Sequence, residues 1–328
     1  MIRVAIIGAG ISALSISHLL GEQAVVTLFE KARAVSGRMS TRRAGPYPFD
    51  HGAQYFTVRT EAFQSFIEPF IQSGLIKRWN ARHVIIDRDT VIERQYWISD
   101  EPRYVGVPGM NNISKKLAEG LNIHLKTKIS ALQRVNGTWH LLDEQGRIHG
   151  DYNWVISTVP SAQAAELLPT SFRYHDRIRR IEMLPCFALM LGFPEKLALD
   201  FDAAHVVHAD ISWIAVNSSK PGRSGPWTLV VHSSADFAKK HLFDDRDAVI
   251  ELLSDETSRV IGHNLGRAGF KAVHGWHFAN NAKRDACSVL LDQDLKLAAC
   301  GDWSEGGRIE GAFTSAVHLA SAIKVSAF

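Results

Sequence analysis

A glycine-rich turn near the start of the chain has the spacing of a phosphate-binding loop. Residues 3–7 form an apolar run rich in β-branched side chains, which predicts a strand. The sequence Gly8-Ala9-Gly10-Ile11-Ser12-Ala13 follows, and apolar residues at helical spacing come after it, from Leu14 to Leu20. In this order of strand, turn and helix, Gly8 permits the turn, Gly10 lets the backbone approach a pyrophosphate, and Ala13 allows close packing. Free amides at the helix start would face the phosphates, so the pattern predicts a dinucleotide site.

An acidic residue lies where such a site needs one. The next apolar run, residues 24–29, predicts a second strand and ends at Glu30. A carboxylate about 20 residues beyond the glycines can accept hydrogen bonds from an adenosine ribose, and it disfavours a 2′-phosphate. The same pattern serves NAD and FAD, so these residues alone do not select the cofactor.

Segments at both ends of the chain make the pattern more specific. Gly37-Arg38 follows the acid closely, and Asp50-His51-Gly52-Ala53-Gln54-Tyr55-Phe56 comes next. Near the other end, residues 295–302 predict a buried strand that ends in Gly301-Asp302, and a helical pattern covers residues 313–322. In this order the segments resemble the flavin-dependent amine oxidase superfamily, in which both ends of the chain bind one FAD.

That resemblance implies roles for the N-terminal segments. Arg38 would offer a guanidinium fork to the pyrophosphate. Residues 50–56 would form a strand beneath the isoalloxazine ring, which the backbone of Gly52 and the amide of Gln54 would reach. The adenine would meet the backbone near Ile129.

The C-terminal segment would complete the cofactor site. The carboxylate of Asp302 would accept hydrogen bonds from ribityl hydroxyls, and a helix start near residues 309–312 would stabilise negative charge at flavin N1 and O2. Covalent amine oxidases place a cysteine in this region, but residues 304–315 contain none, so we expect non-covalent FAD. The expected FAD contacts are Gly8, Gly10, Ile11, Ser12, Ala13, Glu30, Lys31, Gly37, Arg38, Met39, Gly52, Ala53, Gln54, Tyr55, Phe56, Ile129, Gly301, Asp302, Arg308, Ile309, Glu310 and Ala312.

Within the superfamily the chain resembles the renalases, particularly their short bacterial forms. The likeness rests on Gly37-Arg38-Met39-Ser40-Thr41-Arg42, residues 50–57, Val107-Pro108-Gly109-Met110, Trp276-His277-Phe278-Ala279 and Gly301-Asp302-Trp303. Renalases take hydride from the 1,2- and 1,6-dihydro isomers of NAD(P) onto flavin N5, regenerate NAD(P)+ and reduce O2 to H2O2. The resemblance implies the same chemistry here. That chemistry needs no metal and no assigned catalytic side chain, because a dihydropyridine loses hydride without first losing a proton.

A flat dihydronicotinamide ring needs an aromatic slot beside the flavin. Candidate walls and contacts in the middle of the chain are Tyr96, Trp97, Ile98, Trp213, Trp276 and His277. Core packing is the competing interpretation of each of these aromatic residues. Thr57, Arg59 and Glu61 follow the expected flavin segment and are candidate polar contacts, with Arg59 suited to a phosphate or carboxamide.

Three other functions use the same sequence features. An amine oxidase or desaturase on this scaffold would take hydride from a carbon beside nitrogen. A flavin mono-oxygenase would need NADPH, for which no second dinucleotide loop is visible. A non-catalytic protein could use FAD as a folding ligand or redox sensor.

The expected fold is α/β. It contains a Rossmann-like FAD-binding domain of the glutathione reductase/p-hydroxybenzoate hydroxylase type, formed by residues 1–57, 104–160 and 281–328. An inserted α+β substrate domain would comprise residues 58–103 and 161–280. Alternating apolar and polar residues in 91–98, 210–216 and 227–232 predict an antiparallel sheet there.

Composition narrows the function classes. With 328 residues, 46% of them hydrophobic and 22% charged, the chain can bury a large core in two lobes. Its apolar runs are shorter than the roughly 20 residues that cross a bilayer, so we expect no membrane span. A net charge of +3 without a basic run does not predict nucleic-acid binding. The three cysteines have no CxxC spacing, which suits a reducing cytoplasm.

Overall fold

The computed structural model describes residues 1–98, 101–282 and 289–327, and the chain divides into two compact units. Unit 1 comprises Met1–Arg38, Ser114–Met183 and Asn280–Phe328, and unit 2 comprises Met39–Ile113 and Leu184–Ala279. These boundaries differ from the domain limits expected at residues 57, 103 and 160. Residues 39–57 and 104–113 lie in unit 2 because they pair with each other: Phe56 bridges Tyr104, and Met110 N donates to Asp50.

The dinucleotide-binding pattern forms the centre of unit 1. Its sheet has the order β19-β20-β13-β1-β2-β9, with the strands Leu290–Asp292, Leu297–Ala299, Trp154–Ser157, Ile2–Ile7, Ala24–Phe29 and Asn122–His124. All neighbours are parallel except β19 and β20. The central strands β1 and β13 are almost wholly buried, which explains why they are continuous apolar runs.

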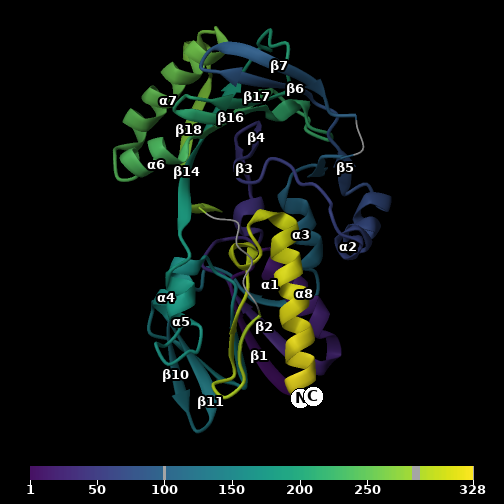
Figure 1. Ribbon diagram of the computed structural model, residues 1–328, viewed down its shortest axis with the longest axis vertical. Coiled ribbons are helices and arrows are strands. Elements are labelled where there is room, and N and C mark those ends of the chain that lie inside the picture. The colour runs from purple at the N-terminus through teal and green to yellow at the C-terminus, as the bar shows by residue number, and fades with distance from the viewer. Residues whose placement is uncertain (99–100, 283–288, 328) are drawn as a thin grey trace. The chain divides into compact units, whose positions relative to one another are not determined.

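Two helices from opposite ends of the chain pack together in unit 1. Helix α1 (Ile11–Leu20) follows β1, and α8 (Arg308–Ala327) follows β20. They lie side by side (Figure 1), and Ser12 Oγ donates to the Ala312 carbonyl at 3.0 Å. The helical pattern expected over residues 313–322 is therefore part of a longer helix, whose first turn reaches the start of α1.

Smaller elements complete unit 1. The strands β10, β11 and β12 form a three-stranded antiparallel sheet, and they span Ile129–Val135, Thr138–Asp143 and Ile148–Tyr152. Helices α4 (Ser161–Leu167) and α5 (His175–Arg179) are short, and the short helix α3 (Asn111–Leu117) begins in unit 2 and ends in unit 1. Residues 161–183 belong to this unit, where the Ser161 hydroxyl donates to the Ile181 carbonyl.

Unit 2 is built on a seven-stranded sheet. Its order is β18-β14-β17-β16-β15-β6-β7, with the strands Phe270–Asn281, Met183–Phe193, Trp227–Ser233, Ile211–Val216, Ala203–Val207, Arg82–Asp87 and Thr90–Tyr96. The pairs β14–β17, β17–β16, β16–β15 and β6–β7 are antiparallel, as expected. The pair β15–β6 is parallel, because β6 comes from the earlier segment and joins the edge of the later strands. The sheet is therefore mixed.

Further helices and short strands complete unit 2. Helices α2 (Glu61–Gln72), α6 (Ala235–His241) and α7 (Arg246–Ile261) each begin after a residue whose side-chain oxygen caps the first turn. Phe187, Leu189, Leu229, Val231 and Phe237 belong to its main hydrophobic core. The strands β3 (Thr41–Ala44) and β4 (Tyr47–Asp50) form one hairpin, and β5 (Ile76–Arg78) pairs with β8 (Tyr104–Gly106).

The segment after β4 corrects one expectation. Residues 50–56 were expected to form a strand, but β4 ends at Asp50 and only Phe56 makes an isolated bridge. Instead, the Gln54 side chain donates from Nε2 to the carbonyls of Asp50 and Gly52, at 2.5 and 2.9 Å. The Gln54 side-chain amide thus makes the backbone hydrogen bonds that a neighbouring strand, or ladder partner, would otherwise make.

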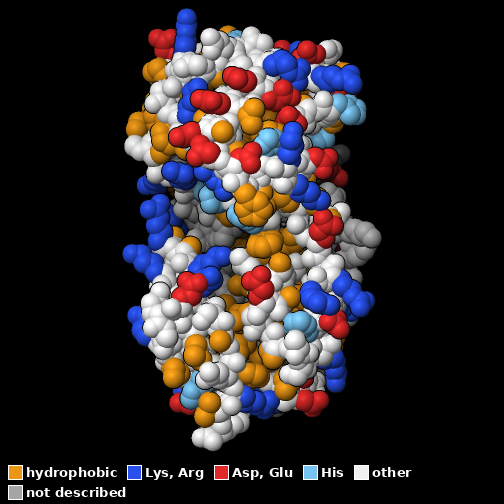
Figure 2. Space-filling model, turned by 90° about the vertical axis from the view of Figure 1, so that its left-hand side faces the viewer, with side chains coloured by type: hydrophobic (Ala, Val, Ile, Leu, Met, Phe, Trp, Pro, Cys, Tyr) orange, Lys and Arg blue, Asp and Glu red, His pale blue; other side chains and the backbone are white. Residues whose placement is uncertain are grey.

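The surface charges and the described cysteines do not indicate a functional site. Acidic and basic side chains are interspersed over the face drawn in Figure 2. None of the described helices combines the length and the hydrophobicity needed to span a membrane. Cys186 and Cys300 are free thiols, and burial raises the pKa of each to about 12. Cys287 lies outside the described residues.

Candidate functional site

The glycine loop of unit 1 has the geometry of a phosphate cradle. Gly8 has a φ of +107°, and its N–H donates to the Phe29 carbonyl at 2.8 Å. A Cβ on Gly8 would lie 2.5 Å from Thr158 Oγ1, so both its conformation and its surroundings require glycine. Gly10 caps α1 with a φ of −79°, and a Cβ there would meet no atom within 4 Å. Open space therefore lies beside Gly10, at the start of the helix.

Glu30 is fixed at the end of β2. Its carboxylate accepts hydrogen bonds from the backbone N–H groups of Ala9 and Ala32, at 2.9 and 2.8 Å, and only 8% of the residue is exposed. The first of these donors belongs to the glycine loop. The acid that the sequence placed at the ribose position is thus held beside that loop.

A second loop lies against the first. Ser36 N–H donates to the Ala9 carbonyl at 3.0 Å, and a Cβ on Gly37 would lie 3.6 Å from Gly10 Cα. Ser36 has a φ of +114°, and its buried hydroxyl has no hydrogen-bond partner in the described part of the chain. A strained residue with an unsatisfied buried hydroxyl beside open space is a typical sign of a ligand site.

Arg38 and Asp302 come together from opposite ends of the chain. Arg38 Nη1 donates to Asp302 Oδ2 at 2.9 Å, and Nη2 donates to Oδ1. Gly307 N–H donates to the Asp302 backbone carbonyl at 2.7 Å and leads into α8. The bidentate ion pair therefore links the second loop to the start of the last helix.

The starts of α1 and α8 meet at the same place. The Ser12–Ala312 hydrogen bond joins their first turns. Gly307 has a φ of +88°, and a Cβ at this position would meet no atom within 4 Å. Helix starts present free N–H groups and partial positive charge. Two helix starts, an open glycine loop, a guanidinium and an acid at the ribose position form a donor set that fits a dinucleotide.

An aromatic group forms in unit 2 from four separate segments. The ring of Trp97 lies 4.8 Å from His83, 5.0 Å from Tyr55 and 6.1 Å from Trp213, measured between ring centroids. The Arg103 guanidinium carbon lies 4.7 Å from the Trp97 ring centroid. Burial, followed by the charges of His205 and Arg103, lowers the pKa of His83 to about 4, so its ring is uncharged at neutral pH.

Three buried polar atoms of this group lack partners. Trp213 Nε1, His83 Nδ1 and Arg103 Nε make no hydrogen bond within the described ranges. A buried polar atom without a partner is costly, so each is a candidate for contact with a ligand. The group combines aromatic faces, a positive charge and unsatisfied nitrogen atoms.

Comparison with known proteins places this arrangement in a family. Residues 6–70 match the NAD(P)-binding Rossmann-like domain, and residues 59–324 match the flavin containing amine oxidoreductase model. The second match covers most of the chain. The chain belongs to the flavin containing amine oxidoreductase family. Its cofactor is FAD, which agrees with the donor set of unit 1.

Solved structures share the fold of this family. The chain is similar to a protein described as a protoporphyrinogen oxidase from Exiguobacterium sp. 255-15, with a TM-score of 0.79 and 12% identity over 99% of both chains. It is also similar to a triple mutant of putrescine oxidase redesigned in its cofactor binding, with a TM-score of 0.73 and 12% identity over 99% of both chains. At this identity the likeness shows the fold alone.

Other predicted FAD contacts of this family member fall into two sets. In unit 1, Ala13 is fully buried in the first turn of α1, Ile129 is buried at the start of β10, and Lys31 is exposed, with Nζ 3.4 Å from Gln163 Oε1. In unit 2, Phe56 packs on Tyr104, and Gln54 is buried. Among the expected contacts of unit 1, the structure brings Glu30 and Gly37 to the glycine loop, Arg38 to Asp302, and Ser12 to Ala312.

The predicted substrate residues differ in their exposure. Trp97 is buried and Trp213 is half-buried, and both belong to the aromatic group. Tyr96 and Ile98 flank Trp97 but are more than half exposed. Trp276 is half-buried, stacks on His51 and donates from Nε1 to the His51 carbonyl at 2.9 Å.

The polar substrate candidates lie at the start of α2. Thr57 is half-buried, whereas Arg59 and Glu61 are exposed on either side of the helix cap Thr60. His277 is exposed on β18. The exposure of these four residues does not test whether they bind substrate, so their substrate roles are proposals.

Sequence reasoning missed several residues of unit 2. His83 and Arg103 join the aromatic group, and Asp50 and Lys220 form a fully buried ion pair with Nζ 3.5 Å from Oδ2. A lysine between two apolar strands, followed by Pro221-Gly222, was a visible but weak signal. For the others no sequence signal exists, because their neighbours come from distant segments.

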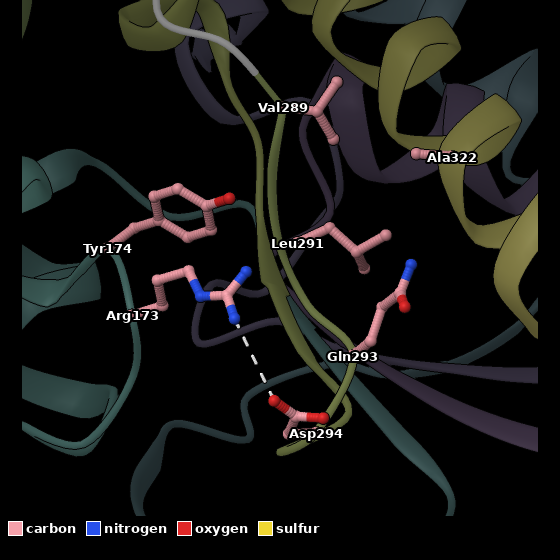
Figure 3. A pocket seen from close by; sticks show the side chains of 7 residues that line it. All are labelled: Arg173, Tyr174, Val289, Leu291, Gln293, Asp294 and Ala322. Atoms are coloured by element: carbon pink, nitrogen blue, oxygen red, sulfur yellow. Dashed lines mark ion pairs between the residues drawn. The ribbon is translucent and has the colours of Figure 1, made fainter.

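Two surface pockets lie apart from these residues. One pocket of about 430 Å³ in unit 1 is lined by Arg173, Tyr174, Val289, Leu291, Gln293, Asp294 and Ala322 (Figure 3). Its Arg173–Asp294 ion pair is long, at 3.9 Å, and exposed, so it stabilises the unit little. The other, of about 420 Å³ in unit 2, includes Arg82, Lys196, Asp202 and Trp227 in its lining. No expected cofactor contact lines either pocket.

Proposed function

We propose that the chain is an FAD-dependent oxidase of the 1,2- and 1,6-dihydro isomers of NAD(P), the activity of the renalases that its sequence resembles. Bound FAD supplies a hydride acceptor at N5 and passes the two electrons to O2, which with the transferred hydrogen and one proton from solvent yields H2O2 and NAD(P)+. The residues of the chain bind and orient both molecules and exclude water.

The aromatic group of unit 2 carries this proposal. A dihydronicotinamide dinucleotide is planar at its ring and anionic at its pyrophosphate. The half-buried Trp213 offers an aromatic surface and an unused hydrogen-bond donor at Nε1, and Arg103, which lies over the buried Trp97 ring, offers positive charge. These features suit such a molecule.

The charges near the other substrate candidates favour an anion over a protonated amine. Burial lowers the pKa of His274, and the positive charges of Arg42 and Arg246 lower it further. The carboxylate of Asp50 is already shared by two cations, Lys220 and Arg223. A cationic substrate would therefore meet repulsion that an anionic dinucleotide would not.

The cofactor roles that we propose are those implied by the family resemblance, and the contacts within unit 1 support them. Glu30 would accept from the adenosine ribose, Arg38 and the amides after Gly10 would meet the pyrophosphate, and Asp302 would accept from the ribityl chain. The start of α8 would face flavin N1 and O2. In unit 2, we assign flavin contacts to the segment from Gly52 to Phe56.

Anaerobic stopped-flow absorbance tests the function. The purified yellow protein is mixed with borohydride-generated dihydro isomers of NAD, with ordinary 1,4-NADH and with a panel of amines that includes putrescine. Rapid bleaching by the minor isomers alone, followed by H2O2 on admission of air, is the expected result. Bleaching by an amine but not by the isomers would assign the chain to amine oxidation. Absence of bleaching by every substrate, with FAD still reduced by dithionite, would exclude both oxidase activities.

A further inference from the structure

Lys220 is a fully buried lysine in unit 2. It follows β16 and a short 3-10 turn, and none of its side chain is exposed. Its Nζ donates to Gln54 Oε1 at 3.0 Å, lies 3.5 Å from Asp50 Oδ2 and lies 5.3 Å from the centroid of the Trp79 ring. An ammonium group without water needs such partners, because burial of an isolated charge is very costly.

Asp50 does not neutralise Lys220 alone. Its buried carboxylate also accepts from Arg223 Nη2, from Thr41 Oγ1 at 2.7 Å and from Met110 N–H at 3.0 Å. One carboxylate therefore faces two cations. When Lys220 is protonated, this buried cluster carries one excess positive charge.

Burial makes the Lys220 proton easy to lose. Burial lowers the pKa of Lys220 to about 7, with Asp50 opposing this shift and Arg223 adding to it. Burial and the charge of Lys220 lower the pKa of the neighbouring His232 to about 4, so this imidazole is uncharged at neutral pH. The charged groups that act on Lys220 are therefore Asp50 and Arg223.

Lys220 also determines the orientation of the Gln54 amide. Gln54 Nε2 donates to the carbonyls of Asp50 and Gly52 and lies 3.3 Å from His232 Nε2. The opposite atom, Oε1, accepts from Lys220 Nζ. Because residues 51–55 have no strand partner, the Gln54 amide fixes the backbone of this segment, and Lys220 fixes the amide.

We propose that Lys220 is a positioning residue that fixes the Asp50–Gln54 segment against FAD and supplies a positive charge that favours reduction of FAD. The inference rests on the proposed contact of Gly52 and Gln54 with the flavin. Reduction by two electrons and one proton leaves one negative charge on the cofactor. A nearby buried ammonium stabilises that charge, and above its own pKa Lys220 takes up a further proton as the charge appears.

The experiment measures the reduction potential of bound FAD and the protons taken up on its reduction in wild type, Lys220→Met and Lys220→Arg. Dithionite and a redox dye of known potential supply the electrons, so no natural substrate is needed. At pH 8 the wild type is expected to take up more than one proton per FAD reduced, whereas both variants take up one. The potential is expected to fall in Lys220→Met and to be largely restored in Lys220→Arg, which keeps the charge.

Lys116→Met, at an exposed lysine of unit 1, is the matched control and is expected to match the wild type in both readouts. A purely structural role would lower the stability of Lys220→Met without changing its potential. Equal potentials and equal proton uptake in wild type and Lys220→Met would overturn the inference. If Lys220→Met does not fold, Lys220→Arg decides it, because wild-type proton uptake in that variant would also overturn it. Loss of activity on dihydro isomers leaves these measurements unaffected, so the two proposals fail separately.

Discussion

Arg38 and Asp302 are 264 positions apart in the sequence and form a bidentate ion pair in unit 1. Each residue belongs to a segment predicted to bind FAD, one at the pyrophosphate and the other at the ribityl chain. The ion pair is only partly exposed, at 29% and 11% of the two side chains. It holds both groups in fixed positions, so binding needs little further ordering of either.

Loss of either partner is expected to weaken FAD binding. A hydrogen bond to a charged group contributes about 1.5–3 kcal/mol, so Asp302→Ala and Arg38→Ala are each expected to raise the FAD dissociation constant by about 10- to 100-fold. Fluorescence quenching of FAD titrated with apoprotein measures this constant. The double variant should lose less than the sum of the two single losses, because each variant already breaks the pair. Additive losses would show that the ion pair does not couple the two contacts.

Gly10 and Gly8 are expected to respond differently to alanine. In Gly10→Ala the φ of −79° and the open space admit the methyl group, so the free energy of unfolding of the apoprotein should change by less than about 0.5 kcal/mol. FAD binding should nevertheless be lost, because the methyl group occupies the space of the pyrophosphate.

Gly8→Ala serves as the contrast. Its φ of +107° and the contact with Thr158 should destabilise the apoprotein by about 1–3 kcal/mol. Thermal unfolding of the two apoproteins and FAD titration separate the effects. Wild-type FAD affinity in Gly10→Ala would contradict the placement of the pyrophosphate.

Lowering the pH from 6.5 is expected to destabilise unit 2 before its carboxylates become protonated. Burial lowers the pKa of His51 and of His232 to about 4, below their ordinary value of 6.5. Between these values the unfolded chain binds more protons than the folded chain, so the free energy of unfolding decreases as pH falls from 6.5 to 4. Each histidine contributes at most about 1.4 kcal/mol per pH unit. Urea unfolding at several pH values measures the slope, which His51→Gln should reduce; an unchanged slope would show that His51 is protonated in the folded state.

Trp213→Phe is expected to affect binding without affecting stability. The variant keeps an aromatic ring and removes an N–H group that has no partner in the described chain, so the free energy of unfolding should not decrease. If the N–H group binds the substrate, KM for the dihydro isomers should rise by about 2- to 10-fold, equivalent to one neutral hydrogen bond. Steady-state peroxide formation measures KM. A stability loss with unchanged KM would assign Trp213 to core packing.

The local pattern of the sequence was sufficient to predict the strands and the helix of the dinucleotide-binding half of the fold. The predicted strands and helix around Gly8 and Gly10 form as β1, α1 and β2, because buried parallel strands need continuous apolar runs and the turn needs a positive φ. Glu30 is held beside the loop because strand and turn lengths fix its distance along the chain. The C-terminal Gly301-Asp302 and the helix after it were also predictable, since they are one continuous segment.

Tertiary structure alone decided the partners of the middle segments. The sequence predicted a strand at residues 50–56, and it did not show that β4 ends at Asp50 or that the amide of Gln54 replaces a ladder partner. Nor did it show that Lys220, 166 positions away, donates to that amide, or that His83 and Arg103 join Trp97 and Trp213. The physical reason is that a local pattern records burial and backbone conformation, which depend on neighbours in the sequence. Charge pairing and aromatic contacts depend on neighbours in space, which exist only once the sheet of unit 2 has assembled.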